Sequence, residues 1–364
     1  MKIQEVIQIL EENIPLQYAE DFDNVGLLVG NPDTDLKGIL ITHDTLEEVV
    51  AEAIAKKLNM IVSFHPIIFS GLKSLTGKNY VERVVMKAVK HDIAIYAMHT
   101  ALDNQHFGVS GVLANRLGLQ NQRVLLPQNK TLRQLVTYVP LAAAEKVRQA
   151  LFEAGAGKIG NYAECSFNVK GIGTFKALDG ANPFVGKIGQ RHAEEEERIS
   201  VVFPKHLQST VIKNLIKAHP YESVAYELFE LLNDNPDIGL GIIGELSEAV
   251  PEISYLKQLK KDLNLSCIRH SALRGKPIRK IAVLGGSGSF AIDAAKASGA
   301  DLYITSDIKY HEFYKAEKQM VIADIGHFES EQYTKLFLFE QLTKKIRNFA
   351  VALSEINTNP INYL

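Results

Sequence analysis

Cysteine is scarce in this chain of 364 residues, which has only Cys165 and Cys267. The two lie far apart, and neither belongs to a CxxC pair. A disulfide framework and a thiolate zinc site are therefore both excluded as the basis of the fold, and the scarcity fits a protein of the reducing cytoplasm.

Long apolar runs and an excess charge of one sign are missing as well. No stretch approaches the ~18 apolar residues of a membrane span, and polar residues interrupt the opening MKIQEVIQILEENIPL too often for a secretion signal. The 40 basic and 42 acidic residues give a formal net charge of -2. Because nucleic acid binders concentrate Lys and Arg, this balance disfavours them. We expect a cytoplasmic protein with no membrane or nucleic acid partner.

Short apolar runs alternate with amphipathic stretches in both end regions of the chain. Such alternation of strand and helix predicts an α/β core with parallel strands, built from two halves of the sequence. The expected strands lie at 38–42, 59–64, 93–98, 280–286, 301–305 and 320–326, and the helices include 3–14, 45–57 and 80–91.

The middle of the chain contains a near-repeat. Each copy has a strand ending in proline, a helix of about three turns and a return strand, so that β-α-β occurs twice, as in a ferredoxin-like module. We expect an inserted ferredoxin-like domain at 128–246 between core halves 1–127 and 247–364. The stretch 176–190 and the acidic run Glu194–Glu197 are interpreted as an exposed loop.

Metal-ligand residue types follow three of the expected strands. His65 follows the strand 59–64, His99 and Asp103 follow 93–98, and His327 and Glu331 follow 320–326. Taken singly, each has a structural alternative: a hydrogen-bonded histidine, an Asx turn and a solvated ion pair. Side chains at the carboxyl ends of parallel strands point into the crevice that holds ligands, so their common location predicts one site.

Imidazole and carboxylate ligands together suit a divalent ion such as Zn, Mn, Fe or Ni. Two ions sharing a carboxylate and a hydroxide would leave the site positive and attractive to phosphate. The sequence therefore predicts metal-assisted hydrolysis of a phosphate-bearing small molecule by a metal-bound hydroxide. His99 is the candidate catalytic proton carrier, because imidazoles titrate near neutral pH.

Two further segments lie beside the expected strands. The glycine-rich VLGGSGS (283–289) is either a phosphate-binding turn before a helix or a tight turn without a ligand. Asp307 and His311 follow the strand 301–305. They are interpreted either as partners that orient metal ligands or as helix-surface residues.

These segments together resemble the GTP cyclohydrolase 1 type 2 homologue family, also called the Nif-three-like family, in its long bacterial form with an inserted domain. The resemblance implies a dinuclear metal site, a homohexameric ring and a purine nucleotide as substrate. The motifs occur in the family's order and are FDNVGLLVG (22–30), SFHPIIFSGLKSL (63–75), MHTALDN (98–104), GGSGS (285–289), ITSDIKYH (304–311) and DIGHFESE (324–331).

The resemblance also implies how the metal ligands are divided. His65, Asp103 and Glu331 match the ligands of one ion, and His327 matches a ligand of a second ion that shares Glu331. The family has a histidine where this chain has Phe64. A phenyl ring cannot bind a metal, so we expect one tightly held ion and a weakened second one.

A nearby histidine, His99 or His106, is the expected substitute if two ions bind equally well. Smaller departures from the family pattern are Phe22 in place of tryptophan and Ser306 in place of glycine. The alternative function is non-enzymatic: a metal-binding ring whose inserted domain senses a small molecule or binds a protein, since a ferredoxin-like module does not define its own ligand.

Overall fold

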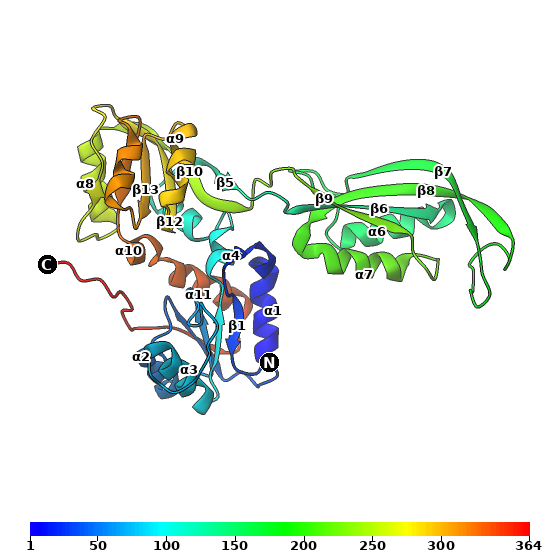
Figure 1. Ribbon diagram of the computed structural model, residues 1–364, viewed down its shortest axis with the longest axis horizontal. Helices are drawn as coiled ribbons and strands as arrows, with labels where there is room; N and C mark the ends of the chain where they lie inside the picture. Colours follow the sequence, from blue (N-terminus) through cyan, green and yellow to red (C-terminus); the bar gives the residue numbers. More distant parts are fainter. The chain divides into compact units, whose positions relative to one another are not determined.

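The computed structural model describes residues 1–364 and separates into two compact units. The core unit comprises residues 1–127 and 236–364, and the inserted unit comprises 128–235 (Figure 1). The second boundary therefore lies before the expected residue 246. Strand β10 (Gly239–Val250) pairs with two strands of the core unit, β5 and β12, which places the start of this strand in the core.

The first sheet of the core unit has the order β1-β4-β3-β2-β15, and all its pairs are parallel except β1 with β4. Successive residues of β2 face opposite helical layers. Ile39 and Ile41 pack against α1 and α11, while Leu40 packs against α2 and α3. The elements are α1 (Ile3–Asn13), β1 (Gly26–Val29), β2 (Gly38–Thr42), α2 (Glu47–Ala55), β3 (Met60–Ser63), α3 (Tyr80–Lys90), β4 (Ala94–Ala97), α11 (Thr334–Lys345) and β15 (Ala350–Leu353).

The second sheet of the core unit has the order β11-β14-β13-β12-β10-β5, with a parallel centre formed by β12, β13 and β14. Helices α5 and α8 cover one face, and α9 with a 3-10 helix, η5, covers the other. The elements are α5 (Val109–Arg116), β5 (Gln120–Pro127), α8 (Glu252–Asp262), β11 (Arg269–His270), β12 (Ile278–Ser287), α9 (Ile292–Ala297), β13 (Leu302–Ser306), η5 (Tyr310–Ala316) and β14 (Val321–Asp324).

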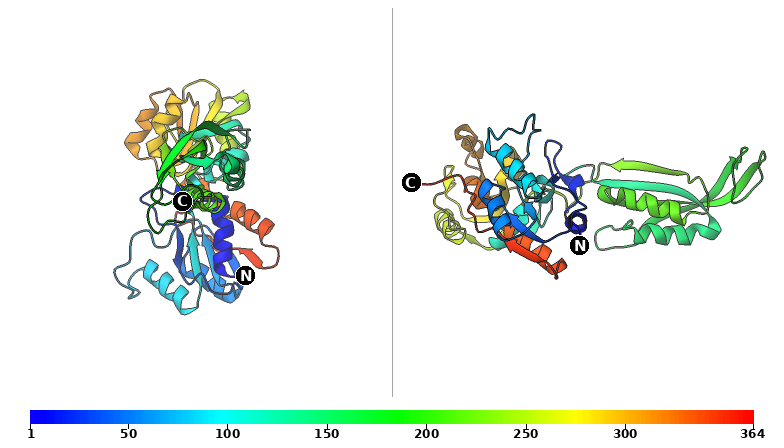
Figure 2. Two further views of the ribbon diagram at one scale, coloured as in Figure 1. Left: turned by 90° about the vertical axis from the view of Figure 1, so that its right-hand side faces the viewer. Right: turned by 90° about the horizontal axis from the view of Figure 1, so that it is seen from below.

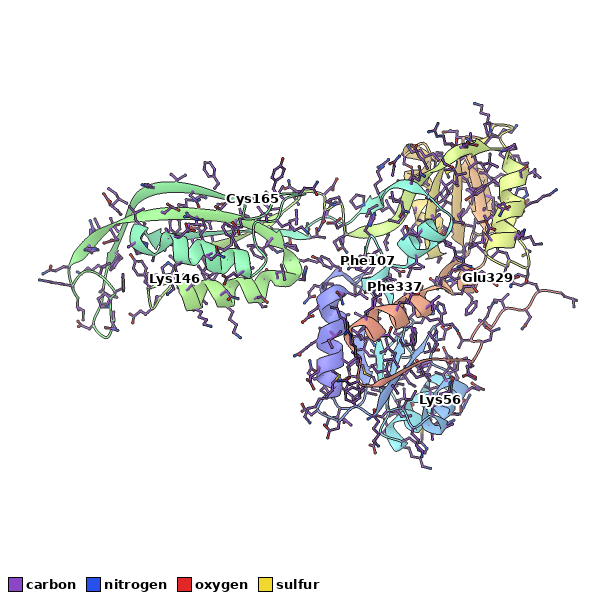
Figure 3. All side chains as sticks on the ribbon, turned by 180° about the vertical axis from the view of Figure 1, so that it is seen from behind. Lys56, Phe107, Lys146, Cys165, Glu329 and Phe337 are labelled. Carbon is purple, nitrogen blue, oxygen red and sulfur yellow. The ribbon has the colours of Figure 1, made fainter.

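The α/β class expected from the sequence is confirmed, because both core sheets have parallel centres between helices. The chain also crosses between the sheets. Helix α11 and strand β15 come after the second sheet in sequence, but β15 pairs with β2 and completes the first sheet. The ring of Phe337 on α11 lies 6.0 Å from that of Phe107, measured between centroids (Figure 3). None of the helices is both long and apolar enough to span a bilayer.

The inserted unit is a four-stranded antiparallel sheet of order β7-β8-β6-β9, whose helices α6 and α7 lie side by side on one face (Figures 1 and 2). Its chain order, β-α-β-β-α-β, is that of ferredoxin-like modules. The elements are β6 (Leu132–Pro140), α6 (Ala144–Glu153), β7 (Ser166–Lys176), β8 (Arg191–Pro204), α7 (Gln208–Ala218) and β9 (Tyr226–Leu231).

The acidic run Glu194–Glu197 was expected in an exposed loop, and this prediction is wrong. The run lies within β8, where Glu194 pairs with Gly173 and Glu197 pairs with Lys170 of β7. The long β7 partner extends the strand beyond the apolar segment that the sequence pattern identifies. Four short 3-10 helices complete the fold: η1 (Leu16–Tyr18), η2 (Leu141–Ala143), η3 (Lys205–Leu207) and η4 (Ser289–Ala291).

Candidate metal centre

Polar side chains from both core sheets meet where their parallel strands end. In the first sheet, His43 follows β2, His65 follows β3, and the short helix α4 (His99–Asp103) follows β4. In the second sheet, Asp307 follows β13 and α10 (His327–Glu331) follows β14. This is the location in which α/β proteins hold ligands.

Glu331 is the centre of the cluster. Its Oε2 atom lies 3.2 Å from Nε2 of His43, 3.3 Å from Nε2 of His327 and 3.4 Å from Nε2 of His65. The carboxylate is buried, with 4% of the side chain exposed. Burial raises the pKa of Glu331, but the imidazoles of His327, His43 and His65 together bring it well below its usual range. Three imidazole nitrogens therefore face one carboxylate oxygen.

Two aspartates orient two of these imidazoles. Nδ1 of His65 donates to Asp44 over 2.7 Å, and Nδ1 of His327 donates to Asp307 over 2.6 Å. Each hydrogen bond turns the other ring nitrogen, Nε2, toward Glu331. Such carboxylate–imidazole pairs fix the tautomer and orientation of metal ligands. For Asp307, the structure therefore favours the orienting role over that of a helix-surface residue.

The same contacts shift the pKa values of both imidazoles. Burial lowers the pKa of His65, but Asp44 and Glu331 outweigh it and raise the value to about 9. For His327, burial again lowers the pKa, while Asp307 and Glu331 raise it to about 10. Without a bound cation, both rings are thus protonated at neutral pH.

His99 lies at the edge of the cluster and has its own aspartate. Its Nδ1 donates to Asp23 over 2.8 Å, and the backbone and hydroxyl of Thr100 donate to the other oxygen of Asp23. Burial raises the pKa of Asp23, but His99 and Thr100 lower it to about 2. The backbone of His99 has a φ of 26°, a strained value for a side chain of this kind. The fold thus holds the His99 ring in one orientation.

Asp103 stands apart from the tight cluster. The ligand atoms within 4.8 Å of one another are those of His65, His327 and Glu331, and, separately, those of His43, Asp44 and His65. Asp103 belongs to neither group, although it lines the same cavity. Burial and the nearby Glu331 raise its pKa well above the usual range. A cation in the cavity would relieve the repulsion between these two carboxyl groups.

The cluster opens into a cavity of about 420 Å³. Its volume is in the range of small-molecule sites. Phe22 and Phe290, 67% and 60% exposed, lie at its rim. The lining residues are Glu20, Phe22, His65, His99, Thr100, Asp103, Ser110, Leu240, Leu284, Gly285, Gly286, Ser287, Phe290, His327 and Glu331.

The glycine-rich turn makes room for Glu331. Gly286 has a φ of +72°, and a Cβ atom there would lie 2.3 Å from Glu331 Oε1. The backbone N–H of Gly286 donates to Ser330 Oγ, and that of Gly285 donates to Ser110 Oγ. Both groups are therefore engaged within the protein, and the structure favours the tight-turn interpretation over a phosphate cradle.

Three residues of the cluster were not anticipated from the sequence: His43, Asp44 and Asp23. The signal for the first two was present, because the dipeptide follows the strand 38–42 in the same way that His65 follows its strand. His106 and His311, by contrast, belong to neither group of converging ligand atoms and do not line the cavity.

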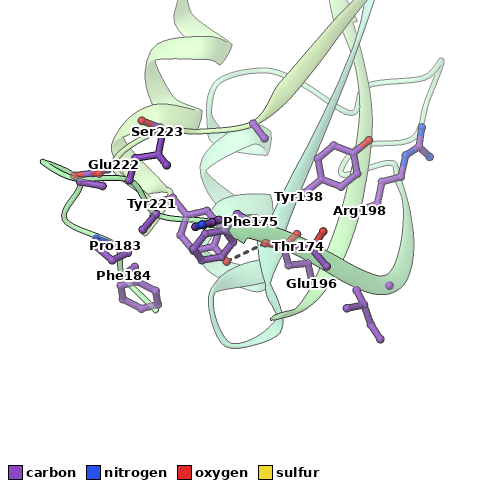
Figure 4. Close-up of a pocket in the computed structure, with 18 of the residues that line it drawn as sticks. Tyr138, Thr174, Phe175, Pro183, Phe184, Glu196, Arg198, Tyr221, Glu222 and Ser223 are labelled. Carbon is purple, nitrogen blue, oxygen red and sulfur yellow. Dashed lines mark hydrogen bonds between the residues drawn. The ribbon is translucent and has the colours of Figure 1, made fainter. Parts of the chain in front are cut away.

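A larger cavity, of about 760 Å³, lies in the inserted unit (Figure 4). Rings of Phe175 and Phe184 lie 6.0 and 6.2 Å from the Tyr221 ring, measured between centroids. The Tyr221 hydroxyl donates to Glu196, a buried carboxylate of β8. The cavity contains none of the residues predicted to bind metal, so the metal centre lies entirely within the core unit.

The fold and the site define the class: an α/β protein in which imidazoles surround a buried carboxylate, a composition that suits divalent metal ions. The orphaned nitrogens of His43 and the orphaned Oε2 of Glu331 are consistent with such an ion. The chain belongs to the Duf34/NIF3 family (NGG1p interacting factor 3), which it matches over residues 1–360. The resemblance stated from the motifs is thereby confirmed.

The relatives match the chain over its full length. A Bacillus subtilis (strain 168) protein named GTP cyclohydrolase 1 type 2 homolog is 37% identical over 371 residues, covering 99% of this chain and 98% of the relative. A Halalkalibacterium halodurans protein of the same name is 38% identical over 367 residues, with the same coverage. The crystal structure of a Bacillus cereus protein related to NIF3 superposes with a TM-score of 0.86 at 37% identity, covering 100% of this chain and 99% of the other.

Proposed function

We propose that this protein is a divalent-metal-dependent hydrolase acting on a phosphate-bearing small molecule, with a purine nucleotide as the substrate class. The observation that carries the proposal is the convergence of three imidazole Nε2 atoms on one buried oxygen of Glu331. Such a donor set suits Zn, Mn, Fe or Ni. The relatives' name, GTP cyclohydrolase 1 type 2 homolog, supports the substrate class.

His65, His327 and Glu331 are the residues that would hold the ion, because their ligand atoms converge within 4.8 Å. Asp44 and Asp307 keep the two imidazoles aimed at it. A bound divalent ion supplies Lewis acidity and lowers the pKa of water. Asp103, on the wall of the cavity, adds the negative charge that balances a second ion.

His99 is proposed to move the proton during hydrolysis. Asp23 accepts from its Nδ1 atom, which leaves Nε2 as the nitrogen available in the cavity. The aspartate fixes the tautomer and the orientation of the ring. General acid–base catalysis by a residue held in this way contributes about 10²–10⁴-fold to the rate.

The cavity suits a ligand with an aromatic part and a polar part. The exposed rings of Phe22 and Phe290 offer stacking surfaces for a base, and His327 and Glu331 line the same cavity. A purine would then rest against the rim with its phosphate directed toward the metal centre.

The test is nucleotide hydrolysis by the full chain after removal of metal and reloading with Zn²⁺, Mn²⁺, Fe²⁺ or Ni²⁺. We expect turnover only with added metal, and its loss in Glu331→Gln. His311→Ala is the control, because His311 is exposed and outside the cavity. Metal binding without turnover on any purine nucleotide would overturn the enzymatic proposal and favour the non-enzymatic alternative.

We also propose that the protein assembles into a homohexameric ring, on the basis of its family. Closed symmetric assemblies are the usual form of homo-oligomers. Light scattering at micromolar concentration should report six chains per particle, and a monomer would contradict the proposal.

A further inference from the structure

His43 is buried, and neither of its ring nitrogens makes a hydrogen bond. Only 2% of the residue is exposed. Leaving a buried polar group without a hydrogen bond is unfavourable. The Nε2 atom lies 3.2 Å from Oε2 of Glu331, which also lacks a hydrogen-bond partner. Two unsatisfied ligand atoms thus face each other in the interior.

Aromatic rings hold the His43 imidazole in place. It stacks on Phe64 with 5.3 Å between centroids and 27° between planes, and Phe328 contacts it edge-on at 5.3 Å. His65 lies 4.7 Å away, also edge-on. The ring therefore cannot turn toward solvent to find a hydrogen-bond partner, and its orientation is fixed by packing.

His43 and Phe64 occupy corresponding positions on neighbouring strands. Strands β2 and β3 are parallel, with Thr42 in register with Ser63, so that the next residue of each strand is His43 and Phe64. The backbone continues this pairing, since Phe64 N–H donates to Thr42 and His65 N–H donates to His43. Phe64 is the position at which the family resemblance implies an imidazole ligand. This chain thus carries an imidazole one strand away from the position where it lost one.

We infer that His43 supplies the metal-binding imidazole that Phe64 cannot, and that with the shared Glu331 it helps to hold a second divalent ion. This inference rests on the proposed metal centre. It replaces the expectation of a weakened second ion, for which His99 and His106 were the candidate substitute ligands. Neither His99, whose Nδ1 is bonded to Asp23, nor His106, which lies outside the cavity lining, is then needed as a substitute.

The experiment is a Co²⁺ and Zn²⁺ titration of the metal-stripped full chain, read as ions per chain and by the visible spectrum of bound Co²⁺. The wild type should bind two ions, and His43→Leu should bind one tightly. The double variant His43→Leu/Phe64→His moves the imidazole back to β3 and should recover two. Loss of a ligand should weaken the second ion by more than the 10–100-fold that loss of an orienting partner causes. His311→Leu is the matched control.

The outcomes separate this inference from the proposed function. A wild type that binds no ion overturns the proposed function. Equal stoichiometry and affinity in the wild type and His43→Leu overturn the assignment of His43 alone, and so does a wild type that binds only one ion. If His43→Leu does not fold, X-ray absorption of the Zn²⁺-loaded wild type decides, since three imidazoles shared by two ions support the inference and two imidazoles refute it.

Discussion

The carboxylate of Asp44 accepts a hydrogen bond from Nδ1 of His65 over 2.7 Å, and the opposite ring nitrogen of His65 faces Glu331. The Asp307–His327 pair repeats this relationship from the other sheet. Asp44 and Asp307 therefore orient the two imidazoles without having to bind the ion themselves. Each sheet thus contributes one aspartate–histidine pair from the ends of two neighbouring strands.

Replacing either aspartate should weaken metal binding without removing a ligand. For Asp44→Asn and Asp307→Asn we expect a 10–100-fold loss of affinity at unchanged stoichiometry, because the imidazole loses its fixed tautomer and orientation. Competition with a chromophoric chelator would measure it. Asp293→Asn, on the exposed face of α9, is the control. Unchanged affinity in both site variants would show that the aspartates serve only the fold.

Metal binding should depend steeply on pH. The pKa values of His65 and His327, about 9 and about 10, mean that both rings are protonated in the metal-free protein at pH 7. An ion binds only the neutral ring, so binding releases protons and apparent affinity rises from pH 7 toward pH 10. Calorimetry in buffers of different ionisation enthalpy would count the protons. Release of none at pH 7 would contradict these pKa values.

The metal-free protein should show the reverse trend in stability. Because folding raises both pKa values above the ordinary histidine value of about 6.5, this stabilisation is fully present below pH 6.5. It is lost as the pH rises through 9 to 10. Urea unfolding of the stripped protein at pH 6 and pH 10 would test the sign, with His65→Gln as the comparison in which the difference shrinks.

The sequence predicts the strands that lead into this site and the pair His327 and Glu331 that follows the last of them, but not all residues of the site. His65 and Glu331 were expected together because the carboxyl ends of parallel strands gather at one edge. The position of His43 was not anticipated, because its importance depends on the ring of Phe64 beside it and on Glu331 from the other sheet. Which two sheets face each other is a long-range property that local periodicity does not contain.

The same limit explains the wrong prediction for the acidic run Glu194–Glu197 in the inserted unit. The apolar pattern of this strand begins only after Glu197, so the sequence predicts no strand in the acidic run. Pairing with β7 nevertheless starts earlier in the chain, at Arg191. In the core unit, the sequence leaves two interpretations of the glycine pair 285–286 open, a phosphate-binding turn and a tight turn without a ligand. Only the nearby Glu331 carboxylate shows why a side chain is excluded.

Gly286→Ala should damage both stability and the metal centre. The substituted residue would retain a φ of +72°, unfavourable by roughly 1–2 kcal/mol, and its Cβ would displace the Glu331 carboxylate. Gly118→Ala is the matched control, since Gly118 has a φ of +68° and open space around the added atom. Both variants should lose stability in urea, but only Gly286→Ala should lose metal affinity. Equal metal affinity in the two would refute the steric role.

His99→Ala should separate catalysis from metal binding. We expect a fall in kcat of about 10²–10⁴-fold with the same number of ions per chain, because His99 belongs to neither group of converging ligand atoms. Asp23→Asn should reproduce part of the loss, since the aspartate holds the His99 ring in its orientation. A variant that loses an ion would identify His99 as a ligand instead.

The inserted unit should fold without the metal centre. All the residues of the centre lie outside 128–235, and the unit has its own core between its sheet and its two helices, including Leu135, Val147 and Phe203. A fragment of residues 128–235 should melt cooperatively, at the same temperature with chelator or with Zn²⁺. The full chain should gain stability from Zn²⁺, because the ion binds the folded core. A disordered fragment would show that the unit depends on the core, and a Zn²⁺-dependent melting temperature of the fragment would reveal a metal site within it.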